Sequence, residues 1–347
     1  MKKKIKKIGS VMMATAMLTT MLMGCGQSAE NNQSEAAENT SQAVAETEAA
    51  TAADSTQKVY KIGVIQLVEH AALDAANKGF IDGLTEAGIQ FEVDQQNAQG
   101  DQTACDTIAT KLVNDGNDLI LAIATPAAQA VVGKTTEIPV LVTAVTDPAS
   151  SGLVDTNEVP GGNVTGTSDL TPIKEQITLL KELLPEAKKV GILYCSAESN
   201  SVFQADIAKK EIESAGLTWE EFTVSSSNEM QSVTESMIGK VDCIYSPTDN
   251  TIAAGMAAVA MVANENNLPA IVGEAGMVAA GGLATYGVDY YNLGKLTATQ
   301  AVKILKGEAT PAQMPIEYLT ADQCAFAGNE ETAAIYNIDL SSYMTKK

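Results

Sequence analysis

The sequence predicts an α/β protein with two lobes, each built on a parallel sheet. Three observations support this fold class. From Tyr60 onward, apolar runs of strand length alternate with amphipathic segments of helical length, the order typical of a parallel sheet with helices on both faces. The alternation restarts near residue 170. About 290 residues follow from Lys58 onward, which is large for one compact core. The same periodicity would also allow one large sheet.

Residues 1–24 have the layout of a secretory signal peptide. Five lysines precede an apolar stretch of 16 residues, Ile8–Met23, which is shorter than the ~20 residues that span a bilayer. The stretch ends Leu22-Met23-Gly24-Cys25 and resembles a bacterial lipobox, in which the cysteine is acylated. The alternative is an ordinary cleaved signal followed by a chance cysteine. We expect lipidation at Cys25 and attachment to the membrane through this lipid.

Residues 25–57 have the composition of a lipid-anchored disordered linker. From Gly26 to Gln57 the chain contains no aromatic residue, lysine or proline, so it cannot bury enough apolar surface to offset its ordering entropy. Its six acidic side chains repel one another and extend it. The leader and linker therefore predict a protein anchored to the membrane rather than spanning it.

The first half of the folded part alternates strands and helices. The segment Ala71–Ala87 illustrates the helical signal, because its large apolar residues recur every three or four positions and the pattern stops at Gly88. The expected strands are Tyr60–Gln66, Phe91–Asn97, Asp118–Ala124, Pro139–Ala144 and Gly162–Ser168, and the other expected helices are Asp101–Asn114 and Pro126–Lys134.

The second half repeats this order. The expected helices are Leu170–Leu184, Ser201–Ala215, Asn228–Ile238, Asn250–Asn266, Gly294–Leu305 and a short one near Glu331–Tyr336. The expected strands are Lys189–Cys195, Leu217–Val224, Val241–Ser246, Pro269–Gly273 and Leu283–Val288, followed by an extended tail, Ile316–Ala327. We assign residues 58–168 plus 289–340 to the N-terminal lobe and 169–288 to the C-terminal lobe.

Charge and composition exclude some partners. The net charge is −21, and loss of the five leader lysines would make it about −26, so a nucleic-acid partner is excluded for want of a basic face. All 22 basic residues are lysine. The ligand therefore cannot be held by the two-pronged guanidinium contact that usually binds phosphate, sulfate or dicarboxylates.

The cysteines and the single histidine indicate neither a metal site nor an enzyme. Cys105, Cys195, Cys243 and Cys324 are widely spaced, without a C-x-x-C pair, so zinc is not expected. His70 has no nucleophile motif beside it. We expect no catalytic residue and no cofactor. Buried free thiols are favoured over a disulfide, although Cys195 and Cys243 both lie near strand ends of one lobe.

Polar residues that follow the strands form the candidate ligand site, because ligands of open α/β sheets bind beyond the carboxyl ends of the strands. Hydroxyls and carboxylates dominate these loops and lysine is absent from them, which suits a ligand bearing an ammonium group. Asp169, Thr248 and Tyr290 lie in the same loops. The candidates are Gln66, Glu69, His70, Thr125, Thr146, Asp147, Ser168, Ser196, Asn200, Asp249, Asn250, Glu274 and Asp289.

Roles can be assigned to a few of these residues. Thr125 precedes Pro126 at an expected helix start, so its hydroxyl and the free N–H groups of that turn could bind a carboxylate. Thr146 offers a second hydroxyl. We expect Glu274 or Asp249 to meet the ammonium group. The alternative for the threonines and for Asp249 is plain helix capping.

Several segments resemble one family. They are IGVIQLVEHAALDAANKGFIDGL (Ile62–Leu84), AVTDP (Ala144–Pro148), GNVTGTSDL (Gly162–Leu170), LATYGVDYYNLG (Leu283–Gly294) and GNEETAAIYNIDL (Gly328–Leu340). They look like the bacterial ABC transporter substrate-binding lipoproteins of the tryptophan/tyrosine type. The resemblance covers about Lys58 to Leu340.

This resemblance implies the type I periplasmic-binding architecture, with two Rossmann-like lobes, a three-crossover hinge and a ligand in the cleft. It also implies delivery of a small solute to ABC permease subunits, with an aromatic amino acid favoured. We expect a monomer on the extracytoplasmic face of the cell membrane. A sugar- or nucleoside-binding protein of the same fold and a ligand-sensing module for a membrane receptor remain alternatives.

Overall fold

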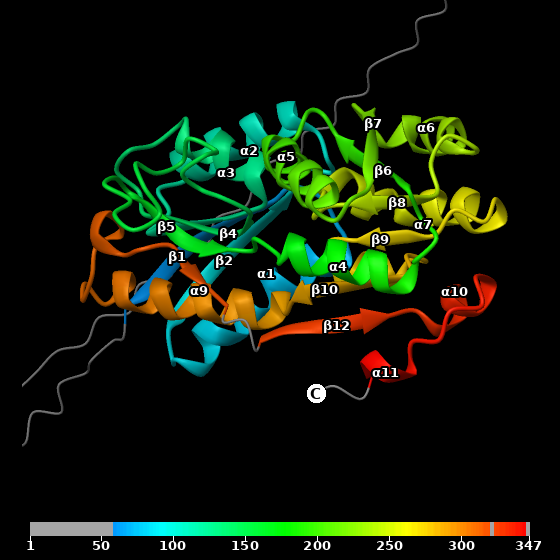
Figure 1. Cartoon of the computed structure of the whole chain (residues 1–347). Coiled ribbons are helices and arrows are strands. Elements are labelled where there is room, and N and C mark those ends of the chain that lie inside the picture. Colours follow the sequence, from blue (N-terminus) through cyan, green and yellow to red (C-terminus); the bar gives the residue numbers. More distant parts are fainter. Residues whose placement is uncertain (1–57, 320–322, 345–347) are drawn as a thin grey trace, which may run out of the picture. The chain divides into compact units, whose positions relative to one another are not determined.

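The computed structural model describes residues 58–319 and 323–344, so the leader and linker lie outside the described residues. The first of two six-stranded sheets has the order β11-β5-β4-β3-β1-β2 (Figure 1). Its strands all pair in parallel. They are β1 (Val59–Gln66), β2 (Gln90–Asn97), β3 (Leu119–Ile123), β4 (Val140–Val145), β5 (Val164–Ser168) and β11 (Glu317–Tyr318).

The second sheet has the order β12-β10-β9-β8-β6-β7. Its pairs are parallel except for β10 and β12, which run antiparallel. The strands are β6 (Lys189–Cys195), β7 (Thr218–Val224), β8 (Cys243–Ser246), β9 (Ala270–Val272), β10 (Ala284–Val288) and β12 (Cys324–Gly328). Two separate sheets, each dominated by parallel pairs, confirm the predicted two-lobed α/β class and exclude the single large sheet.

Four helices pack on the first sheet. Their apolar faces join the strands in one buried core, because both faces of a parallel sheet must be covered. Phe80, Leu112 and Leu293 contribute to this core from three different helices and are fully buried. The helices are α1 (Ala71–Glu86), α2 (Gln102–Asn114), α3 (Thr125–Val132) and α9 (Tyr290–Leu305).

The second sheet has a separate core on each face. Along β6, Val190 and Ile192 belong to one core, whereas Leu193 and Cys195 belong to the other, as the two-residue period of a strand requires. The first core takes in α4 (Ile173–Leu183), α5 (Ser199–Ser214) and α10 (Glu330–Ile335), and the second takes in α6 (Met230–Met237), α7 (Asn250–Glu265) and α8 (Ala275–Ala279). A last short helix, α11 (Ser341–Met344), follows α10.

The chain passes between the sheets three times: between β5 and α4, at Asp289 between β10 and α9, and between Tyr318 and Cys324. The third passage corrects the expected lobe boundary. Residues 324–340 were assigned to the N-terminal lobe, but β12 pairs with β10 of the second sheet and Leu340 is buried in the second lobe's core. Backbone pairing with a distant strand decides this placement.

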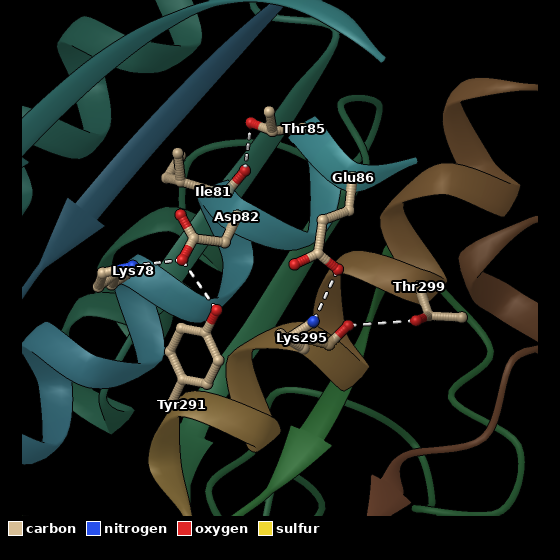
Figure 2. Close-up of polar contacts among 8 residues, drawn as sticks. All are labelled: Lys78, Ile81, Asp82, Thr85, Glu86, Tyr291, Lys295 and Thr299. Atoms are coloured by element: carbon tan, nitrogen blue, oxygen red, sulfur yellow. Dashed lines mark hydrogen bonds and ion pairs between the residues drawn. The ribbon is translucent and has the colours of Figure 1, made fainter. Parts of the chain in front are cut away.

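Close packing of α1 against α9 fixes the start of α9. A Cβ atom on Gly79 would lie 2.0 Å from the carbonyl oxygen of Tyr291, and one on Gly294 would lie 2.0 Å from that of Ala76. Polar contacts flank this seam, among them the Tyr291 hydroxyl donating to Asp82 at 2.9 Å and Lys295 donating to Glu86 at 2.7 Å, as Figure 2 shows. The backbones of the two helices are therefore in direct contact along this seam.

Two helix predictions differ from the structure. Helix α9 begins one turn before the expected Gly294, because the Asp289 side chain accepts a hydrogen bond from the N–H of Asn292. Helix α8 was not expected; it has five residues and begins after Glu274, which caps it. In the described part of the chain, no helix combines the length and apolar character needed to cross a bilayer.

Candidate functional site

A small cavity lies between the lobes, at the carboxyl ends of the strands. Its volume is about 10 Å³, close to the minimum that holds one water molecule. The first lobe and the crossovers contribute His70, Leu73, Ala144, Thr146, Asp169 and Tyr290, and the second lobe contributes Asn200, Thr248, Asp249, Asn250, Ala253 and Glu274. Acidic and amide groups dominate this wall, and none of the described lysines lines it.

Asp169 follows β5 directly, in the first crossover, and is 4% exposed. The hydroxyl of Tyr290, from the second crossover, donates a hydrogen bond to its Oδ2 at 2.7 Å. Its Oδ1 has no hydrogen-bond partner among the described residues. Burial raises the pKa of Asp169 to about 6, although the hydroxyls of Tyr290 and Thr146 act in the opposite direction. The carboxylate therefore has one acceptor free to meet a donor.

Asp249 and Glu274 cap helices from the second lobe. The Asp249 carboxylate accepts from the N–H of Ile252 at 2.7 Å and from that of Cys195 at 2.6 Å. Glu274 accepts from Met277 at 2.9 Å and from Gly276. Burial raises the pKa of each carboxyl to about 7. The nearby carboxylate of Glu198 contributes to the shift at Asp249, and that of Asp169 contributes at Glu274.

Glu198 stands behind this wall and fixes the start of α7. Its carboxylate accepts from the Asn250 side chain at 2.6 Å and from the N–H and hydroxyl of Thr251 at 2.9 and 2.8 Å. Asn250 in turn lies 3.3 Å from Nε2 of His70 across the cleft. Burial lowers the pKa of His70, so at neutral pH the imidazole is uncharged and brings no positive charge to the acids.

A second polar contact joins the lobes at Gln204. Its amide donates to the hydroxyl of Thr146 at 3.1 Å, and its carbonyl oxygen accepts from the hydroxyl of Thr248 at 2.8 Å. All three side chains are buried. Thr146 belongs to the first lobe and the other two to the second, so this chain of hydrogen bonds joins the two lobes.

Thr125 lies at the first turn of α3, after an unusual residue. Ala124 has φ 82°, a left-handed conformation that alanine rarely adopts. Such strain persists where the surrounding structure imposes it and is frequent at functional sites. The Thr125 hydroxyl is buried and has no hydrogen-bond partner within the described residues. The next residue, Pro126, lines a larger neighbouring cavity.

That larger cavity of about 410 Å³ adjoins the small one at Asn250. Residues of the first lobe, such as Leu67 and Val68, line one side, and residues of the second, such as Ala197 and Ala254, line the other. Its volume lies within the range of ordinary small-molecule sites. The two cavities together form the space between the lobes.

The structure brings together six of the predicted site residues: His70, Thr146, Asn200, Asp249, Asn250 and Glu274 line the small cavity. The others lie elsewhere. Glu69 and Ser196 are exposed, and Asp289 is exposed and caps α9. Gln66, Thr125, Asp147 and Ser168 are buried or half-buried outside the cavity wall.

Most of these outlying residues have local partners. Gln66 donates to Asp74, Asp147 accepts from the N–H of Ser150, and Ser168 donates to the carbonyl oxygen of Thr146. Conversely, Asp169 and Tyr290 were predicted only as members of the pocket loops, without a specific role. A carboxylate directly after a buried strand was the available signal for Asp169.

The cysteines and the possible metal ligands can also be placed in the structure. Cys105, Cys195 and Cys243 are free buried thiols, as the sequence predicts. Over the described ranges, no group of three or more His, Cys, Asp or Glu side chains is placed to hold a metal ion.

Comparison with known proteins decides the family. Residues 61–344 match the family described as ABC transporter substrate binding protein. The chain belongs to this family. It is therefore a solute-binding protein rather than an enzyme, as the sequence predicts.

Three relatives are informative. The chain is 40% identical over 333 residues to a tyrosine-binding protein of Clostridioides difficile (strain R20291), covering 95% of this chain and 92% of the relative. It is 40% identical to an ABC domain from Streptococcus pneumonia in complex with L-Trp, covering 83% of this chain and 98% of that one, with a TM-score of 0.80. These matches confirm the predicted family and, with it, the type I periplasmic-binding fold.

The third relative concerns conformation. A ligand-free, open substrate binding protein with adhesive properties from Clostridium difficile is 41% identical, covers 81% of this chain and 96% of its own, and has a TM-score of 0.63. This chain has almost the same sequence identity to the tryptophan complex, yet its TM-score to that complex is 0.80 rather than 0.63. The lobes described here thus superpose better on the tryptophan-bound relative than on the open one, and we call this arrangement, with its small cavity between the lobes, closed.

Proposed function

We propose that this chain is the extracytoplasmic solute-binding lipoprotein of an ABC importer, and that its ligand is an amino acid, with an aromatic one favoured. The observation that carries the ligand class is the wall of buried acids. Asp169, Asp249 and Glu274 line one cavity, lysine is absent from its described wall, and Asp169 has a free acceptor atom. An ammonium group supplies both the donors and the charge that this wall lacks.

We assign the ammonium group to Asp169 first, with Glu274 beside it. This differs from the sequence-based expectation of Glu274 or Asp249. Both of those carboxylates accept hydrogen bonds from backbone N–H groups at helix starts, which leaves them fewer free acceptor positions. Oδ1 of Asp169 makes no such contact.

The carboxylate of the ligand has candidate partners on the first lobe. Thr125 offers a buried hydroxyl without a partner in the described chain, at the start of α3. The N–H groups of that helix start favour an anion. Thr146 offers a second hydroxyl on the cavity wall. Because the small cavity holds only about 10 Å³, the side chain of an amino acid must extend into the larger cavity or displace the walls.

The aromatic preference is supported by two relatives of 40% identity, one named for tyrosine and one in complex with tryptophan. The lipid anchor is supported by the leader and Cys25. Delivery to a permease is supported by the family.

Titration calorimetry on the purified protein tests the ligand class. Tyrosine and tryptophan are compared with their desamino analogues, with tyramine, and with a sugar and a nucleoside as controls. Loss of one partner from a desolvated charged hydrogen bond costs roughly 2–5 kcal/mol, or about thirtyfold to several thousandfold in Kd. We expect the desamino analogues to bind at least thirtyfold more weakly than the amino acids. Equal binding, or preference for the sugar or nucleoside, would refute the assignment.

A further inference from the structure

The acids of the cavity create a difficulty for the empty protein. Asp169, Asp249 and Glu274 are each at most 4% exposed in the closed arrangement, and in the described structure no lysine faces them. Moving carboxylates from water into such a cavity is unfavourable unless a cation or a proton neutralises them. In an open cleft the same groups would be solvated.

We propose that these buried acids act as a closure gate: at neutral pH the empty cleft cannot stay closed, and either a ligand cation or protons on the carboxyls allow it to close. Closure by a ligand cation rests on the proposed function, whereas closure by protonation of the carboxyls does not.

The geometry places the gate at the hinge. Asp169 lies in the first crossover and Tyr290 begins α9 directly after the second, and the two are hydrogen-bonded. Glu274 comes from the second lobe and lies close enough to Asp169 for the charge of Asp169 to raise the pKa of Glu274. Closure therefore brings carboxyl groups from the hinge and from the second lobe into one dry space.

The surrounding titratable groups offer no counter-charge. His70 precedes α1 and Asp74 lies in its first turn, Glu198 and Cys195 flank Asp249, and Tyr290 contacts Asp169. The histidine is neutral for the reason given above, and the remaining groups are neutral or acidic. The carboxyls must therefore be neutralised from outside the protein.

The direction of the pH effect follows from linkage. In the closed form the pKa is about 6 for Asp169 and about 7 for both Asp249 and Glu274, against ordinary values of 3.8 for aspartate and 4.5 for glutamate. Closing the empty cleft therefore takes up protons between about pH 7 and pH 4. For each proton taken up, the closed-to-open ratio rises up to tenfold per unit fall in pH. An ammonium ligand replaces this proton requirement.

A gate of this kind couples closure to loading. At neutral pH, a membrane partner that recognises the closed form would bind the loaded protein. The empty protein, being open, would not compete for that partner. The alternative is a cleft that closes spontaneously whatever its charge.

Small-angle scattering of the ligand-free protein, stripped of any bound solute by unfolding and refolding, tests the gate between pH 8 and pH 5.5. The double variant D169N/E274Q removes two of the ionisable groups without a large change of shape. The matched control is Asp289→Asn, which changes an exposed acid at the same hinge. Circular dichroism at each pH verifies that every protein stays folded.

We expect wild type and the Asp289→Asn control to be expanded at pH 8 and to become more compact as the pH falls. We expect the double variant to be compact already at pH 8. The proposal is overturned if the wild-type radius of gyration stays constant over this range, or if the double variant matches wild type at pH 8. Because no ligand is present, these outcomes are independent of whether the solute is an amino acid.

Discussion

Replacing Asp169 with asparagine separates a ligand-binding role from a structural one. The substitution keeps the shape of the side chain. It also leaves an acceptor for the Tyr290 hydroxyl, which in the wild-type protein donates to Oδ2 of Asp169 at 2.7 Å. It removes the negative charge and replaces one carboxylate oxygen with an NH2 group, which cannot accept a hydrogen bond from an ammonium group. We therefore expect Kd for tyrosine or tryptophan to rise by thirtyfold or more.

The same substitution should weaken binding but should not lower the stability of the ligand-free protein. The pKa of Asp169 is raised from 3.8 to about 6 in the closed fold, so its ionised form costs stability above pH 6 and the cost disappears as the pH falls below 4. A shift of about two units corresponds to about 3 kcal/mol, which is an upper limit because opening of the cleft relieves it. At pH 8 the ligand-free variant should be as stable as wild type or more stable.

Calorimetry with the amino acid and urea unfolding without it, both at pH 8, give the two quantities. Asp289→Asn is the matched control, because Asp289 is an exposed cap of α9 and its loss should leave Kd unchanged. If the role of Asp169 were purely structural, the substitution would lower stability and weaken binding together. Wild-type affinity in the variant would refute the ammonium assignment.

Three further predictions address other parts of the chain. Thr125→Val should raise Kd by about tenfold or more with little loss of stability, since its hydroxyl has no partner among the described residues; unchanged calorimetric affinity would remove it from the site. Gly294→Ala should lower the free energy of unfolding by about 3 kcal/mol, because the new Cβ would lie 2.0 Å from the Ala76 carbonyl oxygen. Gly133→Ala is the matched control and should leave the free energy of unfolding nearly unchanged, because its new Cβ would lie 3.4 Å from the nearest atom. Equal melting temperatures for the two variants would contradict the close α1–α9 packing. Cys25→Ala should release the protein from the membrane fraction or block its processing, and a mature-sized variant that remains in that fraction would exclude lipidation at this cysteine.

Local periodicity was sufficient to predict most of the elements. The strand Lys189–Cys195 was predicted with its observed bounds, because its continuous apolar run is typical of a strand buried on both faces. Helix α8 escaped prediction because five residues are too few to show a helical period. The lobe of residues 324–340 could not be predicted, because it depends on the pairing of β12 with β10 about 40 residues earlier.

The loops that form the site could be predicted from the sequence, but the role of each acidic residue in them could not. The rule that ligands meet the carboxyl ends of parallel strands brought His70, Thr146, Asn250 and Glu274 into one list, and all four line the cavity. Which acid has a free oxygen depends on side-chain geometry at helix starts. Glu274 looked uncommitted in the sequence, yet it caps a helix that the periodicity did not reveal.

The same geometry distinguishes a cationic ligand from a neutral one. A sugar hydroxyl could donate to Oδ1 of Asp169, but it would leave the charges of Asp169, Asp249 and Glu274 buried together without compensation. Backbone N–H groups hold the carboxylates of Asp249 and Glu274 and thereby favour their ionised forms. Burial still outweighs these contacts, since both pKa values are raised to about 7. A closed complex with a neutral ligand would thus have to take up protons on these carboxyls, whereas an ammonium ligand would leave them ionised. Proton uptake on binding at neutral pH, measured by calorimetry in buffers of different ionisation enthalpy, therefore distinguishes the two classes: we expect uptake with a neutral ligand and little or none with an ammonium ligand.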